Sequence, residues 1–176
     1  AFELNPDHGE EGEHILPALA KKYGRSEAEM RATQDQMIAI ATELGLNFEK
    51  MQERYTCNTF DAHRLVKWAA EHGRQTELKK ALFEAYFGKA EDVSDSDVLA
   101  HCVEAAGLDV SEARDVLASD QFAQAVREDE ATYQQAGVSA VPAFVVNNRY
   151  LISGAQEPET LIKTFREIAS EPEGAS

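Results

Sequence analysis

The side chains of this sequence best suited to nucleophilic or redox chemistry are its two cysteines, Cys57 and Cys102. A dithiol oxidoreductase needs two neighbouring thiols at a helix N-terminus, where the helix dipole lowers the pKa of one thiol and favours the thiolate. Cys57 and Cys102 lie far apart, and the sequence contains no Cys-X-X-Cys. The 176 residues alone are therefore predicted to be inactive in dithiol exchange.

The neighbours of the two cysteines predict different environments for them. Cys57 lies at the N-terminal edge of a predicted helix, where the dipole would lower its pKa and make it a possible reactive thiol; packing or chance exposure is the alternative. Cys102 falls on an apolar helical face with Val98, Leu99 and Ala106. That position predicts an inert core thiol.

No other group of side chains has the spacing of a metal or phosphate site. The acidic run from Glu91 to Asp97 lacks the central glycine and the twelfth-position glutamate of an EF-hand loop, so helix capping is the better explanation. The five histidines show no zinc-binding spacing, and no glycine-rich phosphate loop is present. The sequence predicts neither a metal nor a cofactor.

Residues 137–156, with the sequence GVSAVPAFVVNNRYLISGAQ, predict a β-hairpin. The apolar runs Phe144–Val146 and Tyr150–Ile152 flank Asn147 and Asn148, a pair that tolerates the positive φ angles of a tight turn. Pro142 opens the first strand, where its missing N–H does least harm to the ladder of hydrogen bonds.

Residues 137–144 also resemble the cis-proline loop of thioredoxin-fold proteins. The downstream sequences SGAQ (153–156) and PExL (158–161) narrow the resemblance to the DsbA-like group called FrnE. A distant second segment, NTFDAHRL (58–65), is similar to the helical insertion of that group. The resemblance covers nearly the whole chain, except at its start.

The resemblance implies roles for two sets of residues. In thioredoxin-like proteins, the residue before the cis-proline presents its backbone N–H and C=O to an extended substrate. Val141, Pro142 and the adjacent Ala140 are therefore the predicted substrate-binding residues, and an ordinary proline at a strand start is the alternative. The residues of the second segment that could line the cleft are Asn58, Phe60, His63 and Arg64. Helix capping and core packing are the alternatives for these four.

Helical periodicity and capping residues predict a helix-rich chain. The predicted helices cover 13–23, 26–44 from a capping box at Ser26, 59–73, 75–87, 94–107 from Ser94, 111–118 from Ser111, 120–136, and a last helix from Pro158. Apolar stripes are predicted at Met30, Met37, Ile40, Ala41 and Leu44, at Phe122, Ala125, Val126 and Tyr133, and at Leu161, Ile162, Phe165 and Ile168. Apart from the hairpin, the only predicted strand is a short one over Ala1–Leu4.

The predicted fold class is α/β, a thioredoxin-like fold with a large all-helical insertion (DsbA-like) that lacks its first strand and its Cys-X-X-Cys helix. Residues 1–7 and 137–176 would form the incomplete thioredoxin-like part, and residues 8–136 the helical insertion. The missing strand is central in that fold, so its loss would leave buried backbone groups unsatisfied at about 1–3 kcal/mol each. We therefore expect the folded protein to be longer, or a second chain to fill the gap, as in a possible homodimer.

Composition limits the possible partners. Lys+Arg 17 against Asp+Glu 32 gives a net charge of −15, which repels phosphate backbones and anionic lipid and disfavours nucleic-acid and membrane partners. No apolar run approaches the roughly 20 residues of a membrane span. The acidic charge and the scarcity of cysteine favour a cytoplasmic, bacterial location. Secretion stays open because Ala1 is not expected to be a natural start.

The function implied by the resemblance is that of a thiol–disulfide oxidoreductase or isomerase of the DsbA/FrnE type, acting on a protein or small-molecule thiol or disulfide. Its cysteine pair would lie upstream of Ala1. One alternative is a glutathione-dependent isomerase or kappa-type glutathione transferase, although the sequence Gly154-Ala155-Gln156 does not match the glutathione-holding segment of those enzymes. The other alternative is a non-catalytic module for peptide binding or dimerisation.

Overall fold

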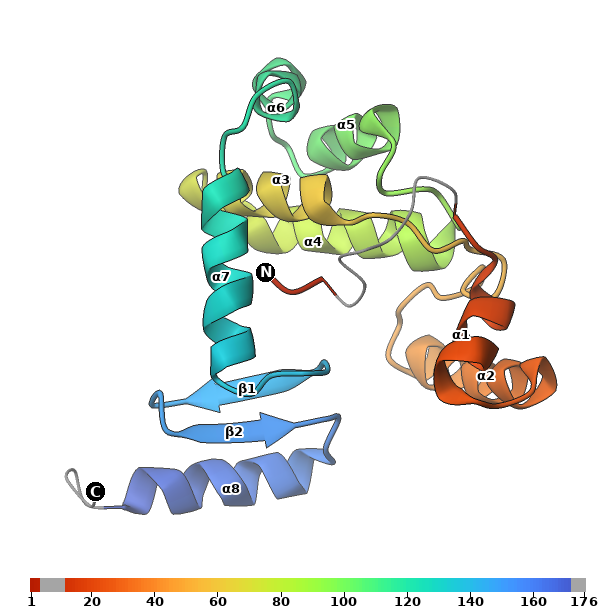
Figure 1. Cartoon of the computed structure of the whole chain (residues 1–176), viewed down its shortest axis with the longest axis vertical. Helices are drawn as coiled ribbons and strands as arrows, with labels where there is room; N and C mark the ends of the chain where they lie inside the picture. The colour runs from red at the N-terminus through yellow and green to blue at the C-terminus, as the bar shows by residue number, and fades with distance from the viewer. Residues whose placement is uncertain (4–11, 172–176) are drawn as a thin grey trace. The chain divides into compact units, whose positions relative to one another are not determined.

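A computed structural model describes residues 1–3 and 12–171 of the chain (Figure 1). The chain divides into two compact units, Ala1–Glu130 and Ala131–Ser176. The described elements, in chain order, are α1 (Ile15–Tyr23), α2 (Glu27–Glu43), α3 (Phe60–Glu71), α4 (Gln75–Phe83), the π-helical turn η1 (Glu84–Gly88), α5 (Ser96–Ala105), α6 (Val110–Leu117), α7 (Ala123–Gln135), β1 (Ala143–Val146), β2 (Tyr150–Ser153) and α8 (Pro158–Ser170).

Along the sequence, the boundary between the two units falls within α7. The first unit is helical in its described part, and the second contains the two strands and α8. The predicted division into residues 1–7 with 137–176, and a helical insertion over 8–136, stays a prediction.

The core of the first unit forms where α3, α4, α5 and α6 pack against one another. Leu65, Leu78, Leu99 and Val103 are at most 1 % exposed. Burial of a side chain of this size contributes about 1.5–3 kcal/mol. Cys102 is buried in the same cluster, which confirms the core position predicted from its neighbours.

The N-terminus of α2 forms as predicted. The hydroxyl oxygen of Ser26 accepts a hydrogen bond from the backbone N–H of Glu29, and the carboxylate of Glu29 accepts one from the N–H of Ser26. This reciprocal pair satisfies two N–H groups that the helix itself leaves without partners. The capping box predicted at Ser26 is confirmed.

The caps predicted at Ser94 and Ser111 are wrong. Asp95 caps α5 and Asp109 caps α6, and each carboxylate accepts a hydrogen bond from a backbone N–H of the first turn. A carboxylate also complements the positive end of the helix dipole, which a serine hydroxyl does not. Ser94 instead donates its hydroxyl proton to Asp92.

The apolar stripe predicted on α2 is buried only in part. Met30 and Ala41 are 5 % and 3 % exposed, whereas Met37, Ile40 and Leu44 are 48 %, 57 % and 70 % exposed. Among the described elements, α1 is the main helix packed on α2. One neighbouring helix covers only a narrow face, so the rest of the stripe faces outwards.

The strand predicted over Ala1–Leu4 is wrong for its described part. Residues 1–3 form no strand, and Leu4 lies outside the described residues. A strand needs a neighbour to complete its hydrogen bonds, and the described sheet consists of β1 and β2 alone. The segment is held by ion pairs instead: the ammonium group of Ala1 donates to Asp129, and Arg127 donates to Glu3.

The second unit contains the predicted β-hairpin. Its strands are antiparallel and pair Ala143 with Ser153, Phe144 with Ile152, Val145 with Leu151 and Val146 with Tyr150. Asn147 and Asn148 both have a φ of 53°, and the N–H of Arg149 donates to the carbonyl of Val146 at 3.1 Å. Positive φ at both central positions is the geometry of a type I′ turn, which suits the twist of a hairpin.

α8 begins with Pro158 in its first turn, as predicted. The ring of Phe165 meets the ring of Phe144 edge to face, with their centroids 6.4 Å apart. Phe165 is nevertheless 38 % exposed and Ile162 48 % exposed, so the stripe predicted on this helix is covered only in part. Tyr133, predicted on the buried face of α7, is 40 % exposed.

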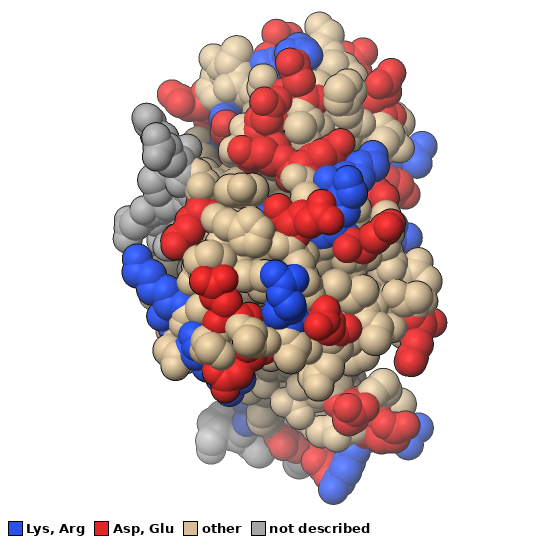
Figure 2. Space-filling model, turned by 90° about the vertical axis from the view of Figure 1, so that its right-hand side faces the viewer, with Lys and Arg blue, Asp and Glu red and all other residues tan. Residues whose placement is uncertain are grey.

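The described surface is acidic. Red side chains outnumber blue ones on the face shown in Figure 2, as the net charge of −15 requires. Within the described residues, no helix combines the length and the apolar character needed to cross a membrane.

Candidate functional site

The loop before β1 starts from a well-defined helix end. Gly137 has a φ of 84°, its N–H donates to the carbonyl of Gln134 at 3.0 Å, and the N–H of Val138 donates to that of Tyr133 at 2.9 Å. This pair of bonds is a Schellman motif, which needs a residue that tolerates positive φ after the helix. Val138 is buried, so it anchors the loop that follows.

Ala140, Val141 and Pro142 lie together in this loop and are exposed. The Val141–Pro142 peptide bond is cis. The carbonyl of Pro142 accepts a hydrogen bond from the N–H of Gly154 at 2.8 Å, which ties the end of the loop to the residue after β2. The strand therefore begins immediately after the proline, as the sequence predicts.

Val141, like Ser139 and Ala140 before it, has a backbone donor and acceptor without a partner among the described residues. Its residue is 50 % exposed, and no hydrogen bond in the described part of the chain involves its N–H or C=O. One donor and one acceptor on an exposed residue beside a strand can pair with an extended chain. Val145 and Leu151, which pair across the hairpin, are also exposed, at 37 % and 40 %.

The second set of predicted residues lies at the N-terminal end of α3, in the first unit. The side-chain oxygen of Asn58 accepts a hydrogen bond from the N–H of Phe60 at 2.8 Å, so Asn58 supplies the predicted cap. The guanidinium of Arg127 lies 4.0 Å from the centre of the Phe60 ring, a cation–π contact. Asn58 therefore acts at the start of the helix, and the ring of Phe60 packs against Arg127.

Arg64 does not line a cleft. The residue is 5 % exposed, and its guanidinium donates to the carboxylate of Asp61 and to the carbonyls of Val116, Ser119 and Gln121. A guanidinium has five N–H donors in a fixed planar arrangement and can bridge several acceptors at once. Arg64 thus fastens α3 to the last turn of α6 and to the segment between α6 and α7, and its cleft-lining role is corrected to a structural one.

His63 is largely enclosed as well. Burial lowers the pKa of its imidazole below the usual value, and the nearby N-terminal ammonium adds to the effect. A hydrogen bond with the backbone of Phe2 acts in the opposite direction. His63 therefore contacts the first residues of the chain and is disfavoured as a charged group near neutral pH.

The environment of Cys57 opposes the lowered pKa that its position predicts. Burial and the neighbouring carboxylate of Asp92 raise the pKa of the Cys57 thiol to about 11. Burial likewise raises the pKa of the Cys102 thiol to about 11. Desolvation and a like charge both disfavour a thiolate, and at Cys57 they outweigh the backbone hydrogen bond from Val93 and the charge of Arg54. The expectation of an activated thiol at Cys57 is therefore corrected.

A cluster of charged side chains around Arg127 was not predicted from the sequence. Glu3 and Glu130 are each 6 % exposed, and both accept hydrogen bonds from the same guanidinium nitrogen of Arg127, at 2.7 and 2.8 Å. One signal was available: Glu130 lies four positions after Val126, on the face of the helix that the apolar pattern marks as buried.

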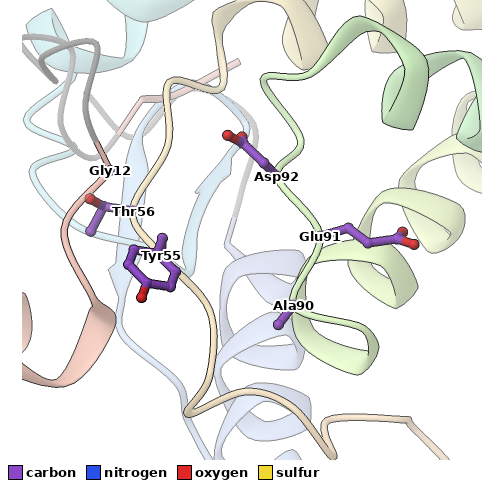
Figure 3. A pocket seen from close by; sticks show the side chains of 6 residues that line it. All are labelled: Gly12, Tyr55, Thr56, Ala90, Glu91 and Asp92. Atoms are coloured by element: carbon purple, nitrogen blue, oxygen red, sulfur yellow. The ribbon is translucent and has the colours of Figure 1, made fainter.

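A shallow pocket of about 250 Å³ lies elsewhere in the first unit (Figure 3). The residues around it are Gly12, Tyr55, Thr56, Ala90, Glu91 and Asp92. The carboxylate of Asp92 points toward the side of Thr56, whereas that of Glu91 points away (Figure 3). A Cβ at Gly12 would lie 2.5 Å from the carbonyl oxygen of Thr56, so the close approach of the two segments requires glycine there. The pocket contains none of the predicted site residues.

Comparison with known proteins identifies the family. Residues 5–166 match the DSBA-like thioredoxin domain, which is most of the chain. The chain belongs to the DsbA-like thioredoxin family. Its predicted fold class, a thioredoxin-like fold with a helical insertion, is confirmed at this level.

Two relatives of this DsbA-like chain support the assignment. It is similar to a crystal structure of a probable DsbA oxidoreductase from Streptomyces coelicolor, with a TM-score of 0.90 and 34 % identity, over 99 % of this chain and 76 % of that one. It is also 25 % identical over 166 residues to the uncharacterized protein YwbO of Bacillus subtilis (strain 168), covering 93 % of this chain and 78 % of the relative. The family is thus one of disulfide oxidoreductases.

Proposed function

We propose that this chain supplies the substrate-binding part of a thiol–disulfide oxidoreductase or isomerase of the FrnE type, with the reactive cysteine pair contributed from outside the 176 residues. The observation that carries the proposal is the exposed Val141, whose N–H and C=O have no partner in the described residues and which directly precedes Pro142. Membership of the DsbA-like family supports the reaction class.

In the proposed reaction, a thiolate attacks one sulfur of a substrate disulfide. The S–S bond of the substrate breaks, a mixed disulfide forms, and the displaced sulfur leaves as a thiolate that takes up a proton. A second cysteine then attacks the mixed disulfide and releases the reduced substrate. The substrate gains two electrons, which the cysteine pair loses in forming its own disulfide.

Val141 would hold the substrate during both steps. An extended peptide beside the loop can donate to the carbonyl of Val141 and accept from its N–H, as a strand does when it joins the edge of a sheet. Backbone pairing of this kind is independent of side-chain sequence, which suits a protein that acts on many disulfides. The exposed apolar side chains of Val145 and Leu151 would add contacts of low specificity.

Cys57 and Cys102 are not the reactive pair in this proposal. Cys102 is buried and Cys57 is half-buried, and the pKa of each thiol is raised to about 11. At neutral pH both sulfurs are therefore almost entirely protonated, and a thiol is a poor nucleophile. We propose a bacterial cytoplasmic location on the basis of the acidic charge and the scarcity of cysteine. The proposed substrate, a protein or small-molecule thiol or disulfide, follows from the family. The proposed homodimer would fill the place of the absent central strand.

The reduction of insulin by dithiothreitol tests the proposed function. The 176-residue chain should not accelerate the reaction, whereas a chain that includes the coding sequence preceding Ala1 should accelerate it. Replacement of both Cys57 and Cys102 by serine in the longer chain should leave its rate unchanged. Turnover by the 176-residue chain at the rate of a thioredoxin, or loss of activity on replacing these two cysteines, would contradict the proposal.

A further inference from the structure

The tight turn that leads into α7 contains a phenylalanine at a position that favours glycine. The N–H of Ala123 donates to the carbonyl of Asp120 at 3.1 Å, which closes a β-turn over residues 120–123. Phe122 has a φ of 62°, whereas the φ of Gln121 is not positive. A positive φ at the third residue alone defines a type II turn, which favours glycine or asparagine there. A bulky side chain in this conformation is strained.

The strained residue also starts the next helix. The carbonyl of Phe122 accepts a hydrogen bond from the N–H of Val126 at 3.0 Å, so Phe122 occupies the cap position of α7. Its ring is partly buried against the core of the first unit. The direction in which α7 leaves the turn therefore depends on the backbone angles of Phe122. Along the chain, α7 precedes the loop that contains Val141.

Arg64 bonds to the peptide group on which the strain depends. Its Nε donates to the carbonyl of Gln121 at 2.9 Å. This carbonyl belongs to the peptide group between Gln121 and Phe122, whose orientation distinguishes a type II turn from a type I turn. In a type I turn the carbonyl would point to the opposite side, and Phe122 would have a negative φ, which is ordinary for phenylalanine. The bond from Arg64 is therefore made in the strained orientation.

The guanidinium of Arg64 is itself fixed. The residue is 5 % exposed, and its other nitrogens donate to the carboxylate of Asp61 and to the carbonyls of Val116 and Ser119. Because the group is planar, its Nε cannot turn away from Gln121 without disturbing these bonds. An Nε–H left without a partner in a buried place would also be costly. The contacts of Arg64 thus favour a single orientation of the peptide.

We propose that Arg64 selects between two arrangements of this turn: its Nε–H holds the Gln121–Phe122 peptide in the strained orientation, and loss of that bond lets the peptide flip to a relaxed turn. A hydrogen bond from a charged donor is stronger than one between neutral groups, so it can stabilise a strained residue. Arg64 is a positioning residue in this proposal, because it acts on the start of α7 through the turn.

Arg64→Lys tests the proposal with little other change. Lysine has a methylene group where arginine has Nε, but it retains the positive charge beside Asp61. A positive φ brings the amide proton and the Hα of a residue close together. In the wild-type chain the nuclear Overhauser effect between these protons of Phe122 should therefore be strong, and in Arg64→Lys it should weaken. A weak effect in the wild-type chain, or a strong one in a folded Arg64→Lys chain, would overturn the proposal.

Glycine and alanine at position 122 measure the same strain through stability. Phe122→Gly and Phe122→Ala both remove the ring, but only glycine readily adopts a positive φ. Urea unfolding should therefore give Phe122→Gly a folding equilibrium constant roughly threefold to tenfold larger than that of Phe122→Ala. In chains that also have Arg64→Lys the order should reverse, because alanine is the more stable residue at a negative φ. The same advantage of glycine in both backgrounds would contradict a flip of the peptide.

Ala90 provides the matched control. It also has a positive φ, of 56°, but Arg64 bonds to Asp61 and to residues 116–121 rather than to the segment around Ala90. Ala90→Gly should therefore stabilise the wild-type chain and the Arg64→Lys chain equally. If Arg64→Lys removed the advantage of glycine at position 90 as well, its effect would be a general one, and the proposed role of Arg64 in the turn would be wrong.

Discussion

At Cys57, burial and the carboxylate of Asp92 raise the thiol pKa, whereas a backbone hydrogen bond from Val93 and the charge of Arg54 lower it. The thiol pKa is about 11, above the ordinary value of about 8.5, so the effects that raise it are the larger ones. A helix N-terminus contributes typically only 0.3–1 kcal/mol, less than one pKa unit. A residue's position relative to a helix therefore cannot give its reactivity unless its burial and its neighbours are known.

The rate at which iodoacetamide alkylates Cys57 should reflect this raised pKa. With a pKa of about 11, the thiolate fraction at pH 7 is on the order of 10⁻⁴, against roughly 3 % for an ordinary thiol. Alkylation in the folded chain should therefore be at least about 100-fold slower than in the urea-unfolded chain, and should increase up to pH 11. Cys102→Ser isolates the signal of Cys57. Equal rates in the folded and unfolded chains would contradict the raised pKa.

At the scale of the secondary-structure elements, one buried arginine holds three segments in place. Replacement of Arg64 by alanine would leave the carbonyls of Val116, Ser119 and Gln121 without their donor. The carboxylate of Asp61 is 46 % exposed and stays hydrated, whereas each carbonyl left without a donor costs at least about 1 kcal/mol. The free energy of unfolding, measured with urea, should therefore fall by about 3 kcal/mol for the three carbonyls.

Arg114 provides the matched control for this prediction. Its side chain is 52 % exposed and pairs with Asp97, whose side chain is 74 % exposed. Exposed ion pairs contribute about 0–1 kcal/mol, so Arg114→Ala should change the free energy of unfolding by no more than that. Equal losses for the two variants would show that Arg64 has no special structural role.

The elements differ in how far the sequence predicts them. Local signals suffice for the capping box at Ser26 and for the hairpin turn at Asn147 and Asn148, because their hydrogen bonds join residues close in sequence. The exposed side of α2 was not predictable, because Ile40 has the right spacing for a buried stripe but the described helices cover only part of it. The caps of α5 and α6 were predicted at the wrong residues because a serine and an aspartate lie close together near the start of each helix. The sequence does not show which of the two side chains accepts the hydrogen bond.

The candidate site also contains features that the sequence predicts and features that depend on contacts between distant residues. The hairpin and the cis bond before Pro142 were predictable from the sequence and its family resemblance, and the substrate-binding role of Val141 and Pro142 stays a prediction. The structural role of Arg64 depends on carbonyls 52–57 positions away in the chain, which periodicity cannot reveal. Glu3 and Glu130 are both buried, and they come from the beginning and the end of the first unit's sequence, so local sequence patterns cannot pair them.

At the scale of the whole molecule, the chain belongs to a family of disulfide oxidoreductases, yet its 176 residues contain no Cys-X-X-Cys. The described residues supply an exposed loop with a free backbone donor and acceptor, held by a hairpin and a Schellman motif. They supply no activated thiol, since the pKa of each cysteine is raised to about 11. Binding of substrate is therefore the step that we propose for these residues.

The most direct test is an NMR titration of the chain with a short peptide whose central cysteine is blocked as a disulfide with glutathione. The amide of Val141 should shift saturably. Val141→Pro lacks the N–H and should weaken binding about threefold to tenfold, as expected for loss of one hydrogen bond of about 0.5–1.5 kcal/mol, whereas Val141→Ala should bind like the wild type. Amide spectra of the hairpin confirm that each variant is folded. No saturable shift at residues 140–143 of the wild-type chain would contradict the account.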